Sequence, residues 1–87
     1  MTAEGDYSEI ADLQLDALDA GTDVDLYKAV LDAGELTFRI PGQAQSLSTA
    51  VTTENGIRMR LTVPGRAGYK VFWSTDGPRI EVVFPHP

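Results

Sequence analysis

The sequence contains no cysteine and only one histidine, His86, among its 87 residues. Without cysteine the chain cannot form disulfides, zinc–thiolate sites or a thiol nucleophile. No run of apolar residues approaches the roughly 20 that span a bilayer, and residues 1–6 lack the basic and apolar segments of a secretory signal. We therefore expect a cytoplasmic protein with no membrane-spanning segment, no metal site and no other cofactor.

The composition is that of an ordinary globular chain. Hydrophobic residues make up 43% of the sequence, charged residues 23% and aromatic residues 8%. A chain of this length forms one hydrophobic core and buries about 60–65% of the surface that its unfolded form exposes. We predict a single domain over residues 1–87.

The charges divide the chain into two unlike halves. Residues 1–38 contain ten acidic side chains and one cation, Lys28, whereas residues 39–87 contain six cations and three acidic side chains. The acidic half is explained either by a solvated helical layer or by a layer that meets a different partner from the basic half.

The N-terminal half has helical periodicity, and we predict a helical hairpin over about residues 8–40. Thr22 and Asp25 fit a capping box for the second helix, which we expect to end at Pro41-Gly42. The first helix is expected to stop at Ala20-Gly21. Residues 7–10 fit either a short strand or the first turn of that helix.

From about residue 46 to residue 85 the period changes to two, which predicts a three- to four-stranded antiparallel meander sheet. Glu54-Asn55-Gly56 is a hairpin signal that fits a two-residue turn or a three-residue loop with a bulge. The predicted fold class is α+β, with the helical hairpin packed on one face of this sheet.

One register satisfies the apolar positions of the last three strands. Pairing Val63 with Tyr69 places Leu61 opposite Val71 and Met59 opposite Trp73. Pairing Trp73 with Ile80 places Val71 beside Val82 and Tyr69 beside Phe84. The same register predicts that these residues share the other face of the sheet: Arg58, Arg60, Thr62, Lys70, Phe72, Arg79, Glu81 and Val83.

On that face Arg60 is predicted to lie opposite Phe72, and Phe72 opposite Glu81. An exposed phenylalanine flanked by arginines can stack on a base while the guanidinium groups hold phosphates. It can also form the centre of a protein contact, or the residues can simply form stabilising cross-strand pairs. The candidate binding residues are Arg58, Arg60, Lys70, Phe72, Arg79 and Glu81.

The order of elements and three strand sequences resemble the RelE/ParE superfamily of small toxins. The strands are Gly56-Ile57-Arg58-Met59-Arg60-Leu61, Gly68-Tyr69-Lys70-Val71-Phe72-Trp73 and Arg79-Ile80-Glu81-Val82-Val83-Phe84. The resemblance covers most of the chain. It implies two helices on one face of a twisted antiparallel sheet, and a cognate antitoxin or another protein as partner. In the ribonuclease branch it also implies that the protein cuts messenger RNA on the ribosome.

The same resemblance implies roles for four residues if the protein is a ribonuclease. Arg58 or Arg60 matches the arginine of the glycine-led strand, and Lys70 stands where that family often has arginine. Arg60 and Lys70 would then stabilise developing phosphate charge, and His86 would transfer a proton.

Three functions therefore remain as hypotheses. The pI of about 4.4 favours a non-catalytic protein-interaction module on a toxin-like scaffold. The first alternative is a toxin–antitoxin system toxin that acts as a ribosome-dependent mRNA endoribonuclease. The second alternative is a structural homodimer formed through the open sheet face around Phe72 and Val83.

Overall fold

The computed structural model of the chain describes residues 6–54, 56–75 and 77–85. Within these ranges the fold is α+β, as predicted, with three helices and one five-stranded sheet. In chain order the elements are β1 (Asp6–Tyr7), α1 (Glu9–Ala20), α2 (Val24–Arg39), α3 (Pro41–Leu47), β2 (Thr49–Thr53), β3 (Gly56–Val63), β4 (Arg66–Ser74) and β5 (Arg79–Pro85).

The sheet is mixed, whereas the sequence predicted a purely antiparallel one. Its strand order is β1-β5-β4-β3-β2, and β1 pairs with β5 in parallel while the other neighbours are antiparallel. The predicted count of three to four strands did not include β1, because a strand of two residues shows no alternation and residues 7–10 fit either a strand or a helix. Residues 7–10 therefore combine both alternatives, since Tyr7 ends β1 and Glu9 begins α1.

The helix boundaries follow from side-chain caps and from proline. The Ser8 side chain accepts a hydrogen bond from the backbone N–H of Ala11 at the start of α1. At the start of α2 the cap is Asp23, which accepts from Leu26, rather than Thr22 as predicted. Pro41 lies in the first turn of a third helix, where its missing N–H costs no hydrogen bond. The segment after α2, which we expected to be a link, therefore forms the helix α3.

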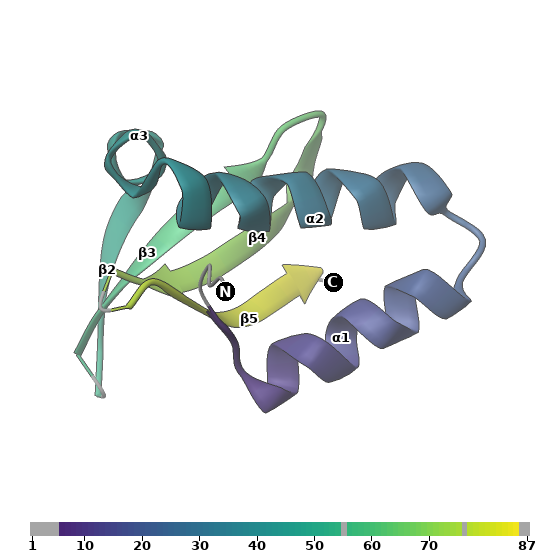
Figure 1. The fold of residues 1–87 in the computed structure, drawn as a ribbon, viewed down its shortest axis with the longest axis horizontal. Coiled ribbons are helices and arrows are strands. Elements are labelled where there is room, and N and C mark those ends of the chain that lie inside the picture. Colours follow the sequence, from purple (N-terminus) through teal and green to yellow (C-terminus); the bar gives the residue numbers. More distant parts are fainter. Residues whose placement is uncertain (1–5, 55, 76, 86–87) are drawn as a thin grey trace.

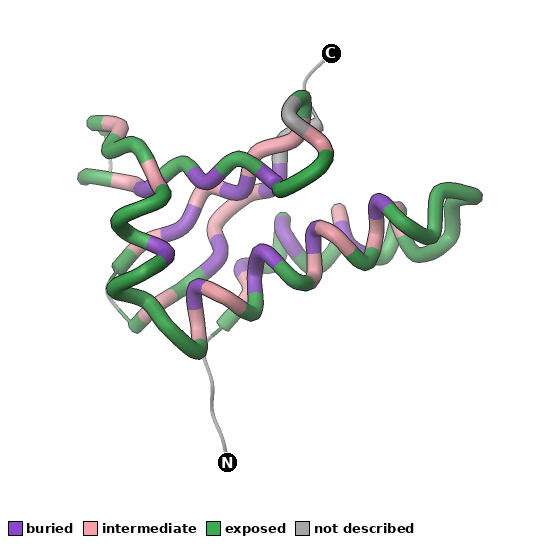
Figure 2. Tube along the Cα trace, turned by 90° about the horizontal axis from the view of Figure 1, so that it is seen from above, coloured by how far each residue is buried: buried purple, intermediate pink, exposed green. Residues whose placement is uncertain are grey.

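The two longer helices lie on one side of the sheet. Figure 1 shows α2 running across β3 and β4, with α1 beside β5. Buried positions recur along both the helices and the strands, as Figure 2 shows, and they form a single cluster. The buried apolar side chains are Ala11, Leu15, Leu26, Val30, Ala33, Ala44, Met59, Leu61, Val63, Val71, Trp73, Ile80 and Val83.

Trp73 is the largest fully buried side chain and lies on β4, the middle strand of the sheet. Its indole N–H donates to Ser48 Oγ at 3.1 Å, and Ser48 Oγ donates to the backbone carbonyl of Ala44 at 2.7 Å. Ser48 lies between α3 and β2. These two bonds therefore connect the centre of the core to the point where α3 ends and β2 begins.

Gly34 allows β1 to approach α2 closely. A Cβ atom at this position would lie 2.5 Å from the hydroxyl oxygen of Tyr7. The Tyr7 ring also packs edge-on against Phe38, with the ring centres 5.3 Å apart. Burial, helped by the nearby Glu35 and Asp12 carboxylates, raises the pKa of the Tyr7 phenol.

The predicted register of β3 with β4 is confirmed over most of its length. Met59 lies opposite Trp73 and Leu61 opposite Val71, but an irregularity between Thr62 and Val63 places Val63 opposite Arg66 instead of Tyr69. The β2–β3 hairpin has a two-residue turn, because Thr53 pairs with Gly56. Gly56 adopts a φ of 116°, which favours glycine.

The predicted register of β5 is correct only at its start. Trp73 lies opposite Ile80 as expected, but Glu81 is an extra residue in β5, so Phe72 pairs with Val82 and Val71 with Val83. The predicted pairs Val71–Val82, Tyr69–Phe84 and Phe72–Glu81 are therefore wrong. Val83, which was assigned to the open face, is 1% exposed and belongs to the core.

Side chains at the N-terminal end of the chain satisfy backbone groups around this bulge. Ser8 Oγ donates to the carbonyl of Glu81, and the Val83 N–H donates to Gln14 Oε1 at 2.7 Å. A bulge leaves ladder groups without strand partners, and buried groups of that kind need other partners. Ser8, which caps α1, and Gln14, which lies within α1, therefore explain why β5 tolerates the extra residue.

Replacing Ser48 with alanine should destabilise the fold. The change leaves the buried Trp73 N–H without its acceptor, which costs about 1–3 kcal/mol in the free energy of unfolding. Ser46→Ala is the matched control, because Ser46 is exposed and its loss should change stability by less than about 0.5 kcal/mol. Urea unfolding measures both values, and equal stabilities for the two variants would contradict the role given to Ser48.

The ion pair between Asp23 and Arg66 predicts acid-dependent stability. Arg66 Nη1 lies 2.8 Å from Asp23 Oδ2, and Arg66 Nη2 lies 3.0 Å from Asp23 Oδ1. The hydrogen bonds from Arg66, with that from the Leu26 N–H, hold the pKa of the Asp23 carboxyl below its usual 3.8. The folded state gains stability above the unfolded pKa and loses it as the pH falls through the lowered value.

Urea unfolding between pH 7 and pH 2 should show this loss in the wild type. The stability difference between wild type and Asp23→Asn should be largest at neutral pH and should shrink below about pH 4. Asp25→Asn removes a carboxylate from the same turn and keeps the pair with Arg66, so it should retain the loss. A difference for Asp23→Asn that stays constant with pH would contradict the assignment.

Candidate functional site

The face of the sheet away from α1 and α2 carries the predicted binding residues of the described part of the chain. We call this surface the open face and define it by Arg58, Arg60, Lys70, Phe72, Arg79, Glu81 and Val82. Directly opposite residues of neighbouring strands share a face. The pairs Arg60–Phe72, Thr62–Lys70, Phe72–Val82 and Ser74–Arg79 therefore place these side chains together. His86, the remaining candidate, lies outside the described residues.

A polar row crosses three strands of the open face. Glu81 Oε2 on β5 accepts from Ser74 Oγ on β4 at 3.2 Å and lies 4.0 Å from Arg58 Nε on β3. The Arg58 and Glu81 side chains are 22% and 23% exposed, so the pair is partly shielded from solvent. Arg58 therefore has a carboxylate neighbour on the open face.

Beside this row lies a partly exposed apolar strip. Phe72 is half-buried between Arg60 on β3 and the half-buried Val82 on β5. Val51 on β2 is also half-buried, but it lies opposite Arg58 and therefore at the end of the polar row. The extra residue in β5 replaces Glu81 with Val82 opposite Phe72, which makes the centre of the face more apolar than predicted.

The cations of the open face differ in their surroundings. Arg60 is exposed, Lys70 is half-buried, and Arg79 Nε lies 3.7 Å from Asp6 Oδ2. Four cations thus share the face with the carboxylates of Glu81 and Asp6, which leaves an excess of positive charge. An apolar strip with a cationic border suits a partner segment that combines apolar and acidic side chains.

The hypothesis of a homodimer through this face requires one correction. It relied on Phe72 and Val83, but Val83 faces the helices and is buried. The sequence contained no visible sign of this, because Val82 and Val83 are both apolar and either one fits an inward position. Among the described side chains of β5, the apolar one on the open face is Val82.

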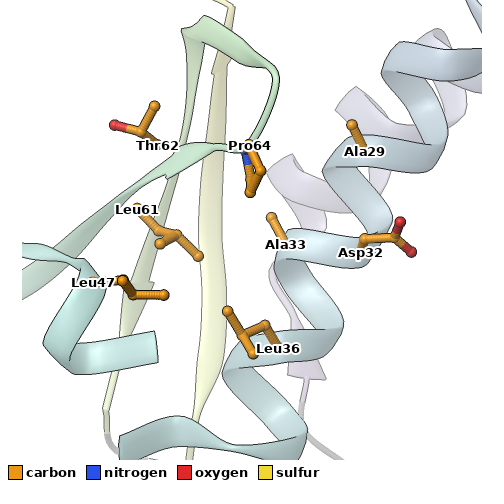
Figure 3. A pocket seen from close by; sticks show the side chains of 8 residues that line it. All are labelled: Ala29, Asp32, Ala33, Leu36, Leu47, Leu61, Thr62 and Pro64. Atoms are coloured by element: carbon orange, nitrogen blue, oxygen red, sulfur yellow. The ribbon is translucent and has the colours of Figure 1, made fainter. Parts of the chain in front are cut away.

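A second surface was missed in the sequence. An open hollow of about 430 Å³ lies between α2, α3 and β3. Figure 3 shows Leu36, Leu47, Leu61 and Pro64 directed toward it, whereas Thr62 and Asp32 point away from its centre. Its full lining is Ala29, Asp32, Ala33, Leu36, Leu47, Leu61, Thr62 and Pro64. The contribution of Leu47 to this hollow could not be seen in the sequence, which suggested a link where α3 lies.

The described residues do not gather three or more histidine or acidic side chains in a geometry that would hold a metal ion. None of the helices in this part of the chain has the length and apolar character to span a bilayer. No protein-family model, curated protein or solved structure matches the chain. The function must therefore be inferred from the surfaces themselves.

Proposed function

We propose that the protein is a small protein-binding module on a RelE/ParE-like scaffold, and that its open face holds an acidic or amphipathic segment of a partner. The observation that carries this proposal is the position of Phe72. It lies half-buried between Arg60 and Val82 on a sheet face that α1 and α2 leave uncovered. Aromatic residues and arginine are enriched at the centres of protein contacts.

The charges of the two layers support a partner of this kind. Residues 1–38, a range that includes β1, α1 and most of α2, hold ten acidic side chains, whereas most cations lie on the strands. An acidic segment is therefore repelled by the helical side and attracted to the open face. In a toxin-like protein, a cognate antitoxin is the expected partner of this chemistry.

The scaffold part of the proposal rests on the order of elements. Helices α1 and α2 precede three consecutive antiparallel strands, β3, β4 and β5, and this order supports a likeness to the RelE/ParE superfamily. The parallel pairing of β1 with β5 completes the sheet on one side.

A peptide selection tests the binding proposal without a known partner. Peptides selected from a random library on the wild type should contain acidic residues beside apolar ones. Phe72→Ala and Arg60→Glu should each weaken their affinity at least about tenfold, or 1.4 kcal/mol, because they remove the apolar centre and reverse a bordering charge. Calorimetric titration measures the affinities.

Arg39→Glu is the matched control, because Arg39 is an exposed cation on α2. It should leave the affinity unchanged, and the melting temperature should show that each variant is folded. Selected peptides that are mainly basic, or that bind Phe72→Ala and Arg60→Glu as tightly as the wild type, would contradict the proposal.

A second candidate function is the ribosome-dependent mRNA endoribonuclease. It is favoured by the common face of Arg60, Lys70 and Phe72, which would let a base stack while cations hold its phosphates. Under this alternative, purified protein added to a cell-free translation reaction cuts transcripts within translated codons, and Arg60→Ala or Lys70→Ala abolishes the cuts.

The binding proposal predicts intact transcripts in the same reaction. Mapping transcript 5′ ends on ribosomes, with and without protein, distinguishes the two functions directly. Cuts by the wild type that both alanine variants lose would replace the binding module with the nuclease. Cuts that both variants retain would contradict the roles of Arg60 and Lys70.

A further inference from the structure

Strand β2 is an edge of the sheet with none of the usual features that prevent pairing. In the order β1-β5-β4-β3-β2 it has a strand neighbour on one side only. It consists of Thr49, Ala50, Val51, Thr52 and Thr53, and it pairs with β3 without a register shift. Charged residues, prolines and bulges normally protect an exposed edge, and β2 has none of them.

The opposite edge is protected by contrast. Strand β1 is two residues long. Beyond it, residues of α1 and its cap form hydrogen bonds with the backbone of β5. The Ser8 N–H donates to the carbonyl of Ile80 at 2.8 Å, and the Val83 N–H donates to Gln14 Oε1 at 2.7 Å. The fold thus covers one edge of its sheet and leaves β2 without a second strand neighbour.

The edge also lies in the longest uncharged stretch of the chain. No charged residue occurs in the fourteen positions from Ile40 to Thr53, which form α3 and β2, although the protein carries a net charge of −6. Two copies would repel each other through their acidic helices. At β2 they can approach without opposing like charges.

Exposed apolar side chains lie near the two ends of this strand. Leu47, at the end of α3, is 59% exposed, and Ile57, which lies opposite Thr52, is 61% exposed. Large apolar groups near both ends of an uncharged edge strand are a pattern of interfaces rather than of solvated edges. One chain contains all the residues of this surface, so two copies can contact each other through the same residues.

We infer that β2 pairs antiparallel with β2 of a second copy of this chain, in a register centred on Val51. This register pairs all five residues, with Val51 opposite Val51 and Ala50 opposite Thr52 of the second copy. It is an isologous contact with a twofold axis perpendicular to the sheet, which closes at a dimer. The two five-stranded sheets become one, with the helices of both copies on the same side.

The dimer does not depend on the proposed binding function, but it has a consequence for it. Both open faces lie side by side on one continuous sheet, so a partner with two binding segments can engage both and gain avidity. The contact is one short strand pair with a few neighbouring side chains. The interface is therefore small, and the dimer dissociates at low concentration.

Sedimentation equilibrium from about 1 µM to about 1 mM, the range of weak association, tests the dimer directly. The wild type should shift with concentration from the 9.4 kDa of one chain to twice that mass. A wild type that remains monomeric up to about 1 mM, or that grows beyond a dimer, overturns the inference.

Two double variants test the register. In Ala50→Lys/Thr52→Lys, every lysine faces a lysine of the second copy, and like charges directly opposite on strands are destabilising. In Ala50→Lys/Thr52→Glu, every lysine faces a glutamate. Ala50 and Thr52 are exposed, so both variants should fold. We expect the first to weaken dimerisation at least tenfold and the second to dimerise at least as well as the wild type.

Net charge cannot produce this result. The lysine pair lowers the overall negative charge and would by itself favour association, whereas the Lys/Glu variant keeps the net charge of −6. Ala17→Lys, an exposed position on α1, should leave dimerisation unchanged. Equal behaviour of the two double variants would overturn the β2 register centred on Val51.

Discussion

The extra residue in β5 determines which side chains face the helices and which face solvent. Side chains alternate along a strand, so one inserted residue reverses every side chain that follows it. With Glu81 inserted, Ile80 and Val83 both lie in the core, and Val82 lies opposite Phe72. The bonds from Ser8 to Glu81 and from Val83 to Gln14 hold this arrangement against α1. Both the core and the open face depend on it.

The opposite end of the sheet depends on Trp73. Its buried N–H requires an acceptor, and Ser48 supplies one at the point where α3 gives way to β2. The strand that forms the uncharged edge therefore begins at a position set by the core. The two anchors, at Ser8 with Gln14 and at Ser48, lie at opposite edges of the same sheet and leave its outer face uncovered.

Much of the fold could be predicted because the alternation in β3 and β4 is regular. Met59, Leu61, Val71 and Trp73 alternate with polar or charged residues except at Phe72, and their pairings are confirmed. In β5 the run Val82-Val83-Phe84 is apolar throughout, so alternation alone does not choose between two registers. The choice is made by Ser8 and Gln14, which are 73 and 69 residues away from their partners.

The other differences have similar causes. Pro41 is as suitable for starting a helix as for ending one, so the sequence does not distinguish a link from α3. Two residues of β1 are too few to show a period. The placement of the candidate binding residues on β3 and β4 followed from regular alternation, whereas the hollow beside Leu47 needed α3 and could not be predicted.

The most direct test of this account is the solvent accessibility of the Val82 and Val83 methyl groups. A neutral soluble gadolinium chelate broadens NMR signals of exposed methyls and spares buried ones. We predict strong broadening for Val82 and little for Val83, with Val71 as the buried reference. Broadening of Val83 with protection of Val82 would show that β5 has no bulge, and the composition of the open face would then be wrong.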